Sequence, residues 1–143
     1  MDSGATYMDG TTDITRTYPL GPLSEDEKRF YTWTLQSHID LARAVWLDYC
    51  ECKMIDTIAR EPLWRHLINY RCGTGHSVSF VGNVHEGPHA LNSRNTTRMR
   101  PGMVVTDEPG VTRLTSWASA SRTSWCACTR PITSTVPSLV LNR

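Results

Sequence analysis

The stretch that decides the fold of this chain reads Gly73-Thr74-Gly75-His76-Ser77-Val78-Ser79-Phe80-Val81-Gly82-Asn83-Val84-His85-Glu86-Gly87-Pro88. Its glycines and β-branched residues predict a strand with a turn at each end. His76 and His85 stand at opposite ends of the segment, so we expect them to face a common cavity. Acidic residues in turn-like contexts flank the stretch on both sides, namely Asp2, Asp13, Asp107 and Glu108.

Two further segments extend this pattern. The first contains Asp2-Ser3-Gly4-Ala5 and Asp9-Gly10-Thr11-Thr12-Asp13-Ile14-Thr15-Arg16-Thr17, and the second reads Gly102-Met103-Val104-Val105-Thr106-Asp107-Glu108-Pro109-Gly110. Together with residues 73–76 and 83–88 they resemble the Xaa-Pro aminopeptidase (aminopeptidase P) family of pita-bread metallopeptidases. The motifs follow one another in the family's order at compatible separations. The resemblance covers residues 2–110.

The resemblance implies a fold class and a chemistry. The fold would be α+β: residues 1–110 would form a partial pita-bread catalytic domain, with an incomplete antiparallel sheet and packed helices. By the same resemblance, two divalent metal ions, manganese first and zinc or cobalt as alternatives, would be bound by Asp2, Asp13, His76 and Glu108. Glu108 would act as general base and His85 would support the transition state.

The substrate implied by the resemblance is a peptide with proline in second position, from which the first residue is released. Intact relatives are expected to assemble as homo-oligomers. A prolidase-like dipeptidase is the nearest alternative within the enzymes. A non-catalytic remnant or binding module on the same scaffold is the alternative outside them.

Several positions depart from the family pattern. Ser77 and Ser79 replace the more usual glycines, and Cys72 stands where many members have another histidine. The family also carries a last, bridging glutamate about fourteen residues beyond Glu108, in a Gly-Ile-Arg-Ile-Glu-Asn-like strand. Here residues 118–123 read Ala-Ser-Ala-Ser-Arg-Thr, and no Asp or Glu follows Glu108. Two adjacent cations would then be poorly neutralised, so we expect a weak or single-metal site.

The tail from Val111 onward is dominated by Ser, Thr, Arg, Trp and Cys without a sustained period. If each codon is rebuilt from the third base of one residue and the first two of the next, Trp117-Ala118 forces glycine. Residues 119–123 then permit Ile-Arg-Ile-Glu-Asn, with the glutamate at Arg122. We therefore hypothesise that a frameshift near Val111 produced an aberrant, disordered tail over residues 111–143. Coding DNA that cannot spell the motif would exclude this hypothesis. Because only Met1 precedes Asp2, we also expect a fragment of a longer product.

Local patterns predict the elements around these motifs. Residues 2–19 are typical of a hairpin turning at Asp9-Gly10, although the simplest interpretation of this segment alone is a turn and a terminal charge. A capping box at Ser24 and Glu27 predicts a long amphipathic helix over residues 24–47. A second helix is expected from Met54, and Pro62 indicates the first position of a short third helix ending near Leu67.

Composition narrows the classes of function. The chain has 143 residues, 39% of them hydrophobic, which suits one modest core. Its 15 basic and 14 acidic side chains give a net charge of +1, so we expect neither nucleic acid nor a membrane as partner. The sequence shows no signal-peptide pattern, and its five cysteines argue against a closed disulfide framework, so we expect a cytoplasmic protein. A zinc site at Cys50-Glu51-Cys52 lacks further ligands, and free thiols are the favoured interpretation.

Overall fold

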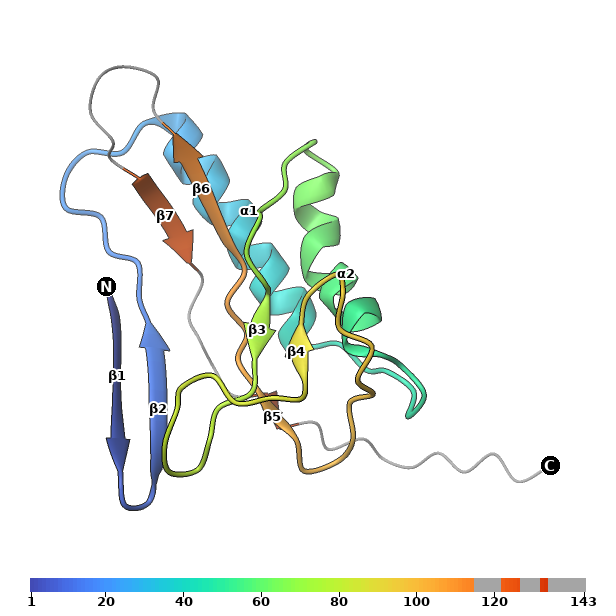
Figure 1. The fold of residues 1–143 in the computed structure, drawn as a ribbon. Helices are drawn as coiled ribbons and strands as arrows, with labels where there is room; N and C mark the ends of the chain where they lie inside the picture. Colours follow the sequence, from blue (N-terminus) through green and yellow to red (C-terminus); the bar gives the residue numbers. More distant parts are fainter. Residues whose placement is uncertain (115–121, 127–131, 134–143) are drawn as a thin grey trace.

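The computed structural model describes residues 1–114, 122–126 and 132–133, and beyond residue 112 it describes the backbone. Two helices and a set of short antiparallel strand pairs make up the fold (Figure 1). The elements are β1 (Asp2–Tyr7), β2 (Gly10–Thr15), α1 (Glu25–Ala42), α2 (Cys52–Trp64), β3 (Gly75–His76), β4 (Ala90–Leu91), β5 (Val104–Val105), β6 (Gly110–Leu114), β7 (Arg122–Cys126) and β8 (Ile132–Thr133). The pairs are β1 with β2, β3 with β4, β5 with β8, and β6 with β7. This arrangement confirms the expected α+β class and the incomplete antiparallel sheet.

The predicted N-terminal hairpin is confirmed. Strands β1 and β2 pair from Asp2 opposite Thr15 to Tyr7 opposite Gly10. Gly10 has a φ of 152°, a backbone conformation that side-chain-bearing residues rarely adopt, which explains the glycine in the turn. The tip is joined to the rest of the molecule by the Thr6 hydroxyl, which donates to the Gly82 carbonyl at 3.0 Å. The hairpin therefore lies against the loop that leads from His76 to His85.

Helix α1 begins as the capping box predicts. The Ser24 hydroxyl accepts from the Glu27 backbone N–H, and the Glu27 carboxylate accepts from the Ser24 N–H. The helix ends at Ala42, earlier than the expected residue 47. Trp46 still enters the core, 8% exposed, while its neighbour Val45 is 86% exposed. These apolar residues therefore lie in an irregular segment and do not continue the helical stripe.

Helix α2 corrects the expectation of two separate helices. It runs unbroken from Cys52 to Trp64 with Pro62 inside it. Pro62 lies in the last turn, so its missing N–H removes one late helical bond, while its buried ring packs beside Leu63. At the other end, the N–H groups of Cys52 and Lys53 have no acceptor within the helix. They donate to the carbonyls of Thr97 and Asn95, at 2.8 and 2.9 Å respectively. A distant loop thus caps a helix that has no side-chain cap.

The main core joins both helices to the short strands. Its most deeply buried members come from α1, α2, β4, β5 and the loop before β5, namely Leu41, Cys52, Ile55, Ala59, Leu91, Met99 and Val105. A second cluster contains Leu63, Tyr70 and Val111. In Figure 1 the two helices lie side by side, behind the strands that carry the central histidine stretch. Within the described residues, neither helix is long and apolar enough to cross a membrane.

The expected disordered tail falls largely on residues 115–121, 127–131 and 134–143, which lie outside the described part of the chain. Within the tail, the backbone of β6 pairs with β7 from Gly110 opposite Cys126 to Leu114 opposite Arg122. Strand β8 pairs with β5. Arg122, where the family's last glutamate was expected, is therefore the first residue of a strand. The frameshift and the domain boundary at residue 110 remain predictions.

A buried arginine connects α2 to the segment that leads into β3. The Arg60 side chain donates to the Asp56 carboxylate at 2.7 Å, to the Tyr70 carbonyl at 2.7 Å and to the Cys72 carbonyl at 2.9 Å. The Asp56 carboxylate also accepts a short hydrogen bond from the Thr74 hydroxyl. Arg60 and Asp56 thereby fix the backbone immediately before His76.

We expect the Arg60→Gln variant to lose about 3 to 5 kcal/mol of unfolding free energy, because it leaves the buried Asp56 carboxylate without its cation. Urea denaturation followed by far-ultraviolet circular dichroism measures the loss. The matched control is Arg65→Gln on the same helix, which removes an exposed pair with Glu61 at the same i, i+4 spacing. Equal destabilisation by the two substitutions would contradict a special role for the buried pair.

Candidate metal centre

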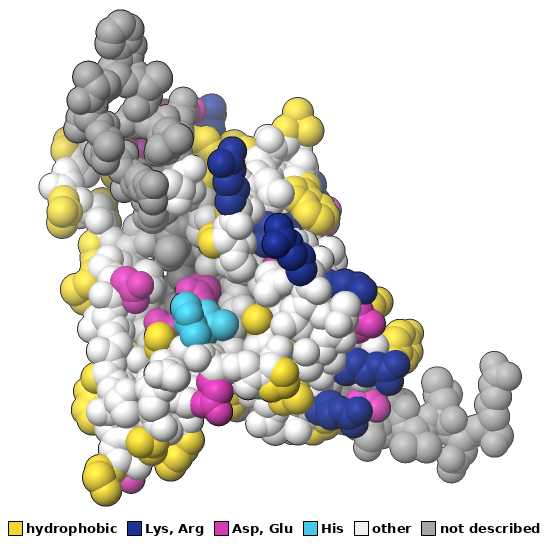
Figure 2. Space-filling view, viewed as in Figure 1, with side chains coloured by type: hydrophobic (Ala, Val, Ile, Leu, Met, Phe, Trp, Pro, Cys, Tyr) yellow, Lys and Arg dark blue, Asp and Glu magenta, His cyan; other side chains and the backbone are white. Residues whose placement is uncertain are grey.

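Three separate parts of the chain bring an acidic or imidazole group to one point. Asp13 comes from β2, His76 from β3 and Glu108 from the segment after β5, and one ligand atom of each lies within 4.8 Å of the other two. The His76 Nε2 atom is 2.8 Å from Glu108 Oε1 and 3.3 Å from Asp13 Oδ2. Figure 2 shows acidic and histidine side chains gathered in a hollow beside the hairpin. The structure thus assembles three of the four residues predicted to bind metal.

Backbone hydrogen bonds on both sides of β3 hold His76. On one side β3 pairs with β4, with His76 opposite Ala90. On the other, the Thr106 N–H donates to the His76 carbonyl and the Glu108 N–H donates to the Thr74 carbonyl, both at 2.8 Å. A Cβ atom on Gly75 would lie 1.9 Å from the Thr106 carbonyl oxygen, so glycine is required for this approach. His76 and Glu108 therefore meet because the two backbone segments that carry them are hydrogen-bonded to each other.

Thr106 joins the Glu108 side chain to the His76 backbone. Its hydroxyl donates to Glu108 Oε1 at 2.6 Å and accepts from the His76 backbone N–H at 2.9 Å. Thr106 is 3% exposed, so water does not compete for these bonds. The sequence carries no signal for this role of Thr106, since a threonine at the end of an apolar strand is an ordinary residue there.

The second nitrogen of His76 is also occupied. Its Nδ1 atom lies 3.1 Å from the Ser77 carbonyl oxygen. A proton on Nδ1 would donate to that carbonyl and leave the Nε2 lone pair directed at Asp13 and Glu108. Histidine ligands of metal ions commonly have this arrangement, in which the outer nitrogen donates to a carbonyl. The imidazole and the carboxylates together form a donor set that fits a divalent cation.

The electrostatics of the site follow from this crowding. Burial and the neighbouring Glu108 charge raise the pKa of Asp13 above its ordinary value. Burial acts in the same direction on Glu108, but hydrogen bonds from His76 and Thr106 prevail and lower the pKa of Glu108. For His76, burial acts to lower the pKa, yet the hydrogen bonds to Glu108 and to the Ser77 carbonyl raise it. A cation placed among these carboxylates would relieve their mutual repulsion.

Asp2 and His85 border the same cavity. Asp2 lies on β1 and is exposed, and it lines a cavity of about 480 Å³ together with Asp13, His76, His85 and Glu108. Its charge contributes to the raised pKa of Asp13. The His85 ring lies edge to face with the His76 ring, with centroids 3.9 Å apart. All five candidate residues thus face one cavity, with Asp2 outside the tight group of three.

Asp107 and His38 lie behind the site. Asp107 is one of the acidic residues that flank the central histidine stretch in the sequence. In the structure it is fully buried and faces α1, where His38 Nδ1 lies 2.9 Å from its Oδ2 atom. Burial raises the pKa of Asp107, and the adjacent His38 opposes that rise. His38 is thus a buried partner that joins α1 to the turn carrying Glu108.

Comparisons with known proteins show what this chain is similar to. The sequence model of metallopeptidase family M24 matches residues 1–129. A probable Xaa-Pro aminopeptidase P of Laccaria bicolor is 46% identical over 112 residues, which cover 76% of this chain and 17% of that protein. Aminopeptidase P1 of Lotus japonicus is 47% identical over 110 residues, with coverage of 76% and 17%. The chain therefore spans under a fifth of these relatives.

Solved structures of an X-prolyl aminopeptidase and of a prolidase are also similar to this chain. The X-prolyl aminopeptidase of Caenorhabditis elegans, described as a cytosolic enzyme with a di-nuclear active site, has a TM-score of 0.77 and 35% identity. The match covers 89% of this chain and 20% of that one. The prolidase of Pyrococcus furiosus has a TM-score of 0.72 and 25% identity, over 94% of this chain and 40% of that one.

The raised pKa of His76 predicts a pH-dependent stability in the metal-free chain. A base whose pKa is raised on folding stabilises the fold fully below its ordinary pKa, here 6.5, and loses that effect as the pH rises through the raised value. Urea unfolding in chelator should therefore show lower stability at about pH 8 than at about pH 6. In the His76→Gln variant, the part of this stability difference that comes from His76 should disappear. An unchanged pH dependence in the variant would contradict the assignment.

Proposed function

Since the chain belongs to metallopeptidase family M24, we propose that its cavity is the metal-binding part of an aminopeptidase that hydrolyses the bond between an N-terminal residue and a following proline. The observation that carries the proposal is the meeting of Asp13, His76 and Glu108 within 4.8 Å. The similarity to aminopeptidase P proteins at 46% and 47% identity supports the substrate class. The cytosolic description of the Caenorhabditis elegans enzyme supports the expected cytoplasmic location.

The proposed site holds two divalent cations, with Mn²⁺ first and Zn²⁺ or Co²⁺ as alternatives. Asp2, Asp13, His76 and Glu108 are the proposed ligands. The di-nuclear site of the Caenorhabditis elegans relative supports the number of ions. Because no Asp or Glu follows Glu108 in this chain, we expect the second ion to be held more weakly than the first.

The residues of the chain would act as follows. A bound cation would supply a Lewis acid that polarises the scissile carbonyl and lowers the pKa of water. Glu108, kept ionised by its hydrogen bonds from His76 and Thr106, would accept the proton of the attacking water. His85 would donate a hydrogen bond to the oxyanion that develops on the scissile carbonyl.

A non-catalytic remnant on the same scaffold is the second candidate. The observation that favours it is the lack of any carboxylate side chain after Glu108, which removes the expected bridging ligand. In that case the chain would bind peptides or a single cation without turnover. The two candidates differ in metal content and in hydrolysis.

The proposed function predicts metal-dependent cleavage of Ala-Pro-Ala by the full chain after reloading with Mn²⁺. Elemental analysis gives the bound metal, and chromatography of released alanine gives the rate. We expect Asp13→Asn and His76→Gln to lower the rate by at least about 100-fold, because each removes a metal ligand. The control His66→Gln changes an exposed histidine stacked on Trp33 and should leave the rate unchanged. Preference for the dipeptide Ala-Pro would indicate a prolidase, and no metal with no turnover would support the remnant.

Thr106 provides a separate test that does not depend on turnover. The Thr106→Val variant keeps the side-chain shape but removes the hydroxyl that orients Glu108, so we expect Mn²⁺ affinity to fall by about 10- to 100-fold. Isothermal titration calorimetry measures it. The Thr106→Ser variant retains the hydroxyl and should retain most of the affinity. If serine and valine weaken binding equally, Thr106 acts through packing and not through its hydrogen bonds.

A further inference from the structure

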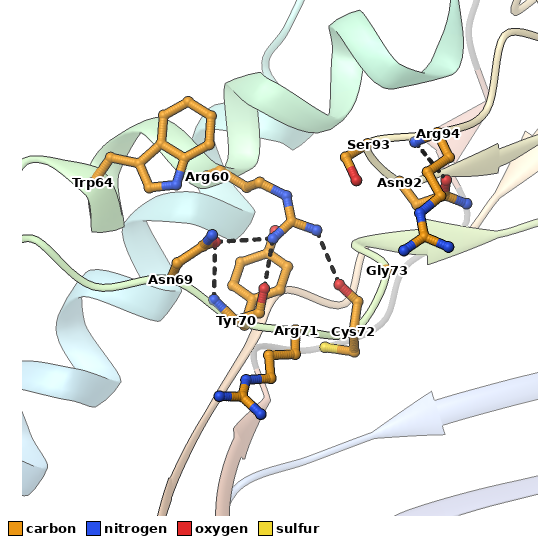
Figure 3. Close-up of a pocket in the computed structure, with 10 residues that line it drawn as sticks. All are labelled: Arg60, Trp64, Asn69, Tyr70, Arg71, Cys72, Gly73, Asn92, Ser93 and Arg94. Atoms are coloured by element: carbon orange, nitrogen blue, oxygen red, sulfur yellow. Dashed lines mark hydrogen bonds between the residues drawn. The ribbon is translucent and has the colours of Figure 1, made fainter.

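A second cavity, distinct from the candidate metal centre, is lined by arginines. It has a volume of about 650 Å³ and lies between the end of α2, the segment before β3 and the loop after β4. Its walls include Arg60, Arg71, Arg94, Trp64, Cys72 and Asn92. Figure 3 shows the Arg60 and Arg94 guanidinium groups on one side of the segment that carries Tyr70 and Cys72, and the Arg71 guanidinium on the other side. Among the residues that the structure describes, no acidic side chain lines this cavity.

The positive charge of this cavity is only partly balanced. Arg60 is buried and pairs with Asp56, so that pair is neutral. Arg71 and Arg94 are exposed, and in the described part of the chain no ion pair joins either of them to a carboxylate. The residues beyond 112 cannot supply an acidic side chain, because none follows Glu108. Within the described residues, two positive charges therefore border this cavity without an acidic side chain paired to them.

The arginine-lined cavity adjoins the candidate metal centre through a third cavity of about 490 Å³. This connecting cavity shares His76, His85 and Glu108 with the metal-centre cavity. It shares Cys72, Gly73 and Asn92 with the arginine-lined cavity. At the boundary, Gly73 has no side chain, and a Cβ atom there would lie 3.3 Å from the Leu91 carbonyl oxygen and 3.7 Å from Asn92 Cβ. Gly73 therefore adds no side-chain atoms to the boundary between the two cavities.

The spacing suits a short peptide. Cys72 and His76 are separated by four residue steps, so their Cα atoms lie at most about 14 Å apart. An extended peptide covers that distance with about four residues. In the metal-free chain, the state in which binding is tested below, the charges of the connected cavities are also opposite, with Asp2, Asp13 and Glu108 at one end and Arg71 and Arg94 at the other. A peptide with a free ammonium group and a carboxylate some four residues later matches this polarity.

We infer that the arginine-lined cavity binds a carboxylate on the C-terminal side of the peptide substrate. This inference rests on the proposed function and narrows its substrate class to short peptides of about four residues with an acidic group at or near their end. Arg94 is the principal contact because it lines the cavity, is exposed, and lies on the same side of the segment as Arg60. Guanidinium groups bind carboxylates in a two-pronged geometry. Arg71 adds charge at the rim. The acidic group is either the terminal carboxylate or a glutamate side chain.

Three peptide probes test the inference: Ala-Pro-Ala-Ala, its C-terminal amide, and Ala-Pro-Ala-Glu amide. Binding to the full chain is measured by isothermal titration calorimetry in chelator at low ionic strength, because salt screens exposed charges. We expect both acidic probes to bind about five- to tenfold more tightly than the neutral amide. An advantage for only one acidic probe identifies which carboxylate is recognised and supports the site.

Substitutions locate the effect. Arg94→Gln should remove the preference for acidic probes, and Arg71→Gln should reduce it. The control Arg98→Gln removes an exposed arginine from the same loop that does not line the cavity, and it should leave the preference unchanged. A preference that persists in the Arg71→Gln, Arg94→Gln double variant overturns the inference, as does equal or absent binding of all three probes to the unmodified chain.

The outcome is separable from that of the proposed function. Hydrolysis of all three probes at the same kcat/KM with Mn²⁺ would support the peptidase and overturn the carboxylate site. Binding with the expected preference but no hydrolysis would support the carboxylate site and overturn the peptidase.

Discussion

The close approach of two backbone segments, residues 74–76 and 106–108, is the constraint on which this structure depends. Two backbone hydrogen bonds of 2.8 Å join them, and the absent side chain of Gly75 makes the approach sterically allowed. A methyl group at position 75 would overlap the Thr106 carbonyl. Because His76 and Glu108 lie on these two segments, the same bonds that form the sheet also assemble the candidate metal centre.

Each helix fixes one of the two segments through a buried polar contact. Arg60 and Asp56 of α2 bind the backbone and the Thr74 hydroxyl ahead of His76. His38 of α1 faces Asp107, next to Glu108. Buried charged groups cost free energy unless they are paired, so these contacts hold only when the helices and segments are correctly docked. The helices therefore contribute more than an apolar support for the strands.

Charge is distributed unevenly along the connected cavities. Carboxylates lie close together at the end beside the hairpin. There burial raises the pKa of Asp13, and the charges of Glu108 and Asp2 raise it further. Within the described residues, arginines without an acidic side chain paired to them border the opposite end. On the face shown in Figure 2, histidine and several acidic side chains gather near the hairpin, and most basic side chains lie over the half that holds α2 and β4, with some acidic side chains among them. A net charge of +1 conceals this polarity, since it sums over both ends.

The sequence by itself determined the local elements and the identity of the residues that face the main cavity. Asp9-Gly10 predicted the hairpin turn and Ser24 with Glu27 predicted the start of α1, because turns and caps depend on residues a few positions apart. Motif order pointed to Asp13, His76 and Glu108, which the structure places together.

Only the tertiary structure decided the unbroken course of α2 through Pro62 and the early end of α1, because packing outweighs local preference there. The roles of Thr106, Arg60 and the His38 and Asp107 pair also depend on partners from other elements. So does the arginine-lined cavity, whose walls come from segments some thirty residues apart. Such contacts have no local signal, since a side chain's chemistry is set by the neighbours that folding brings to it.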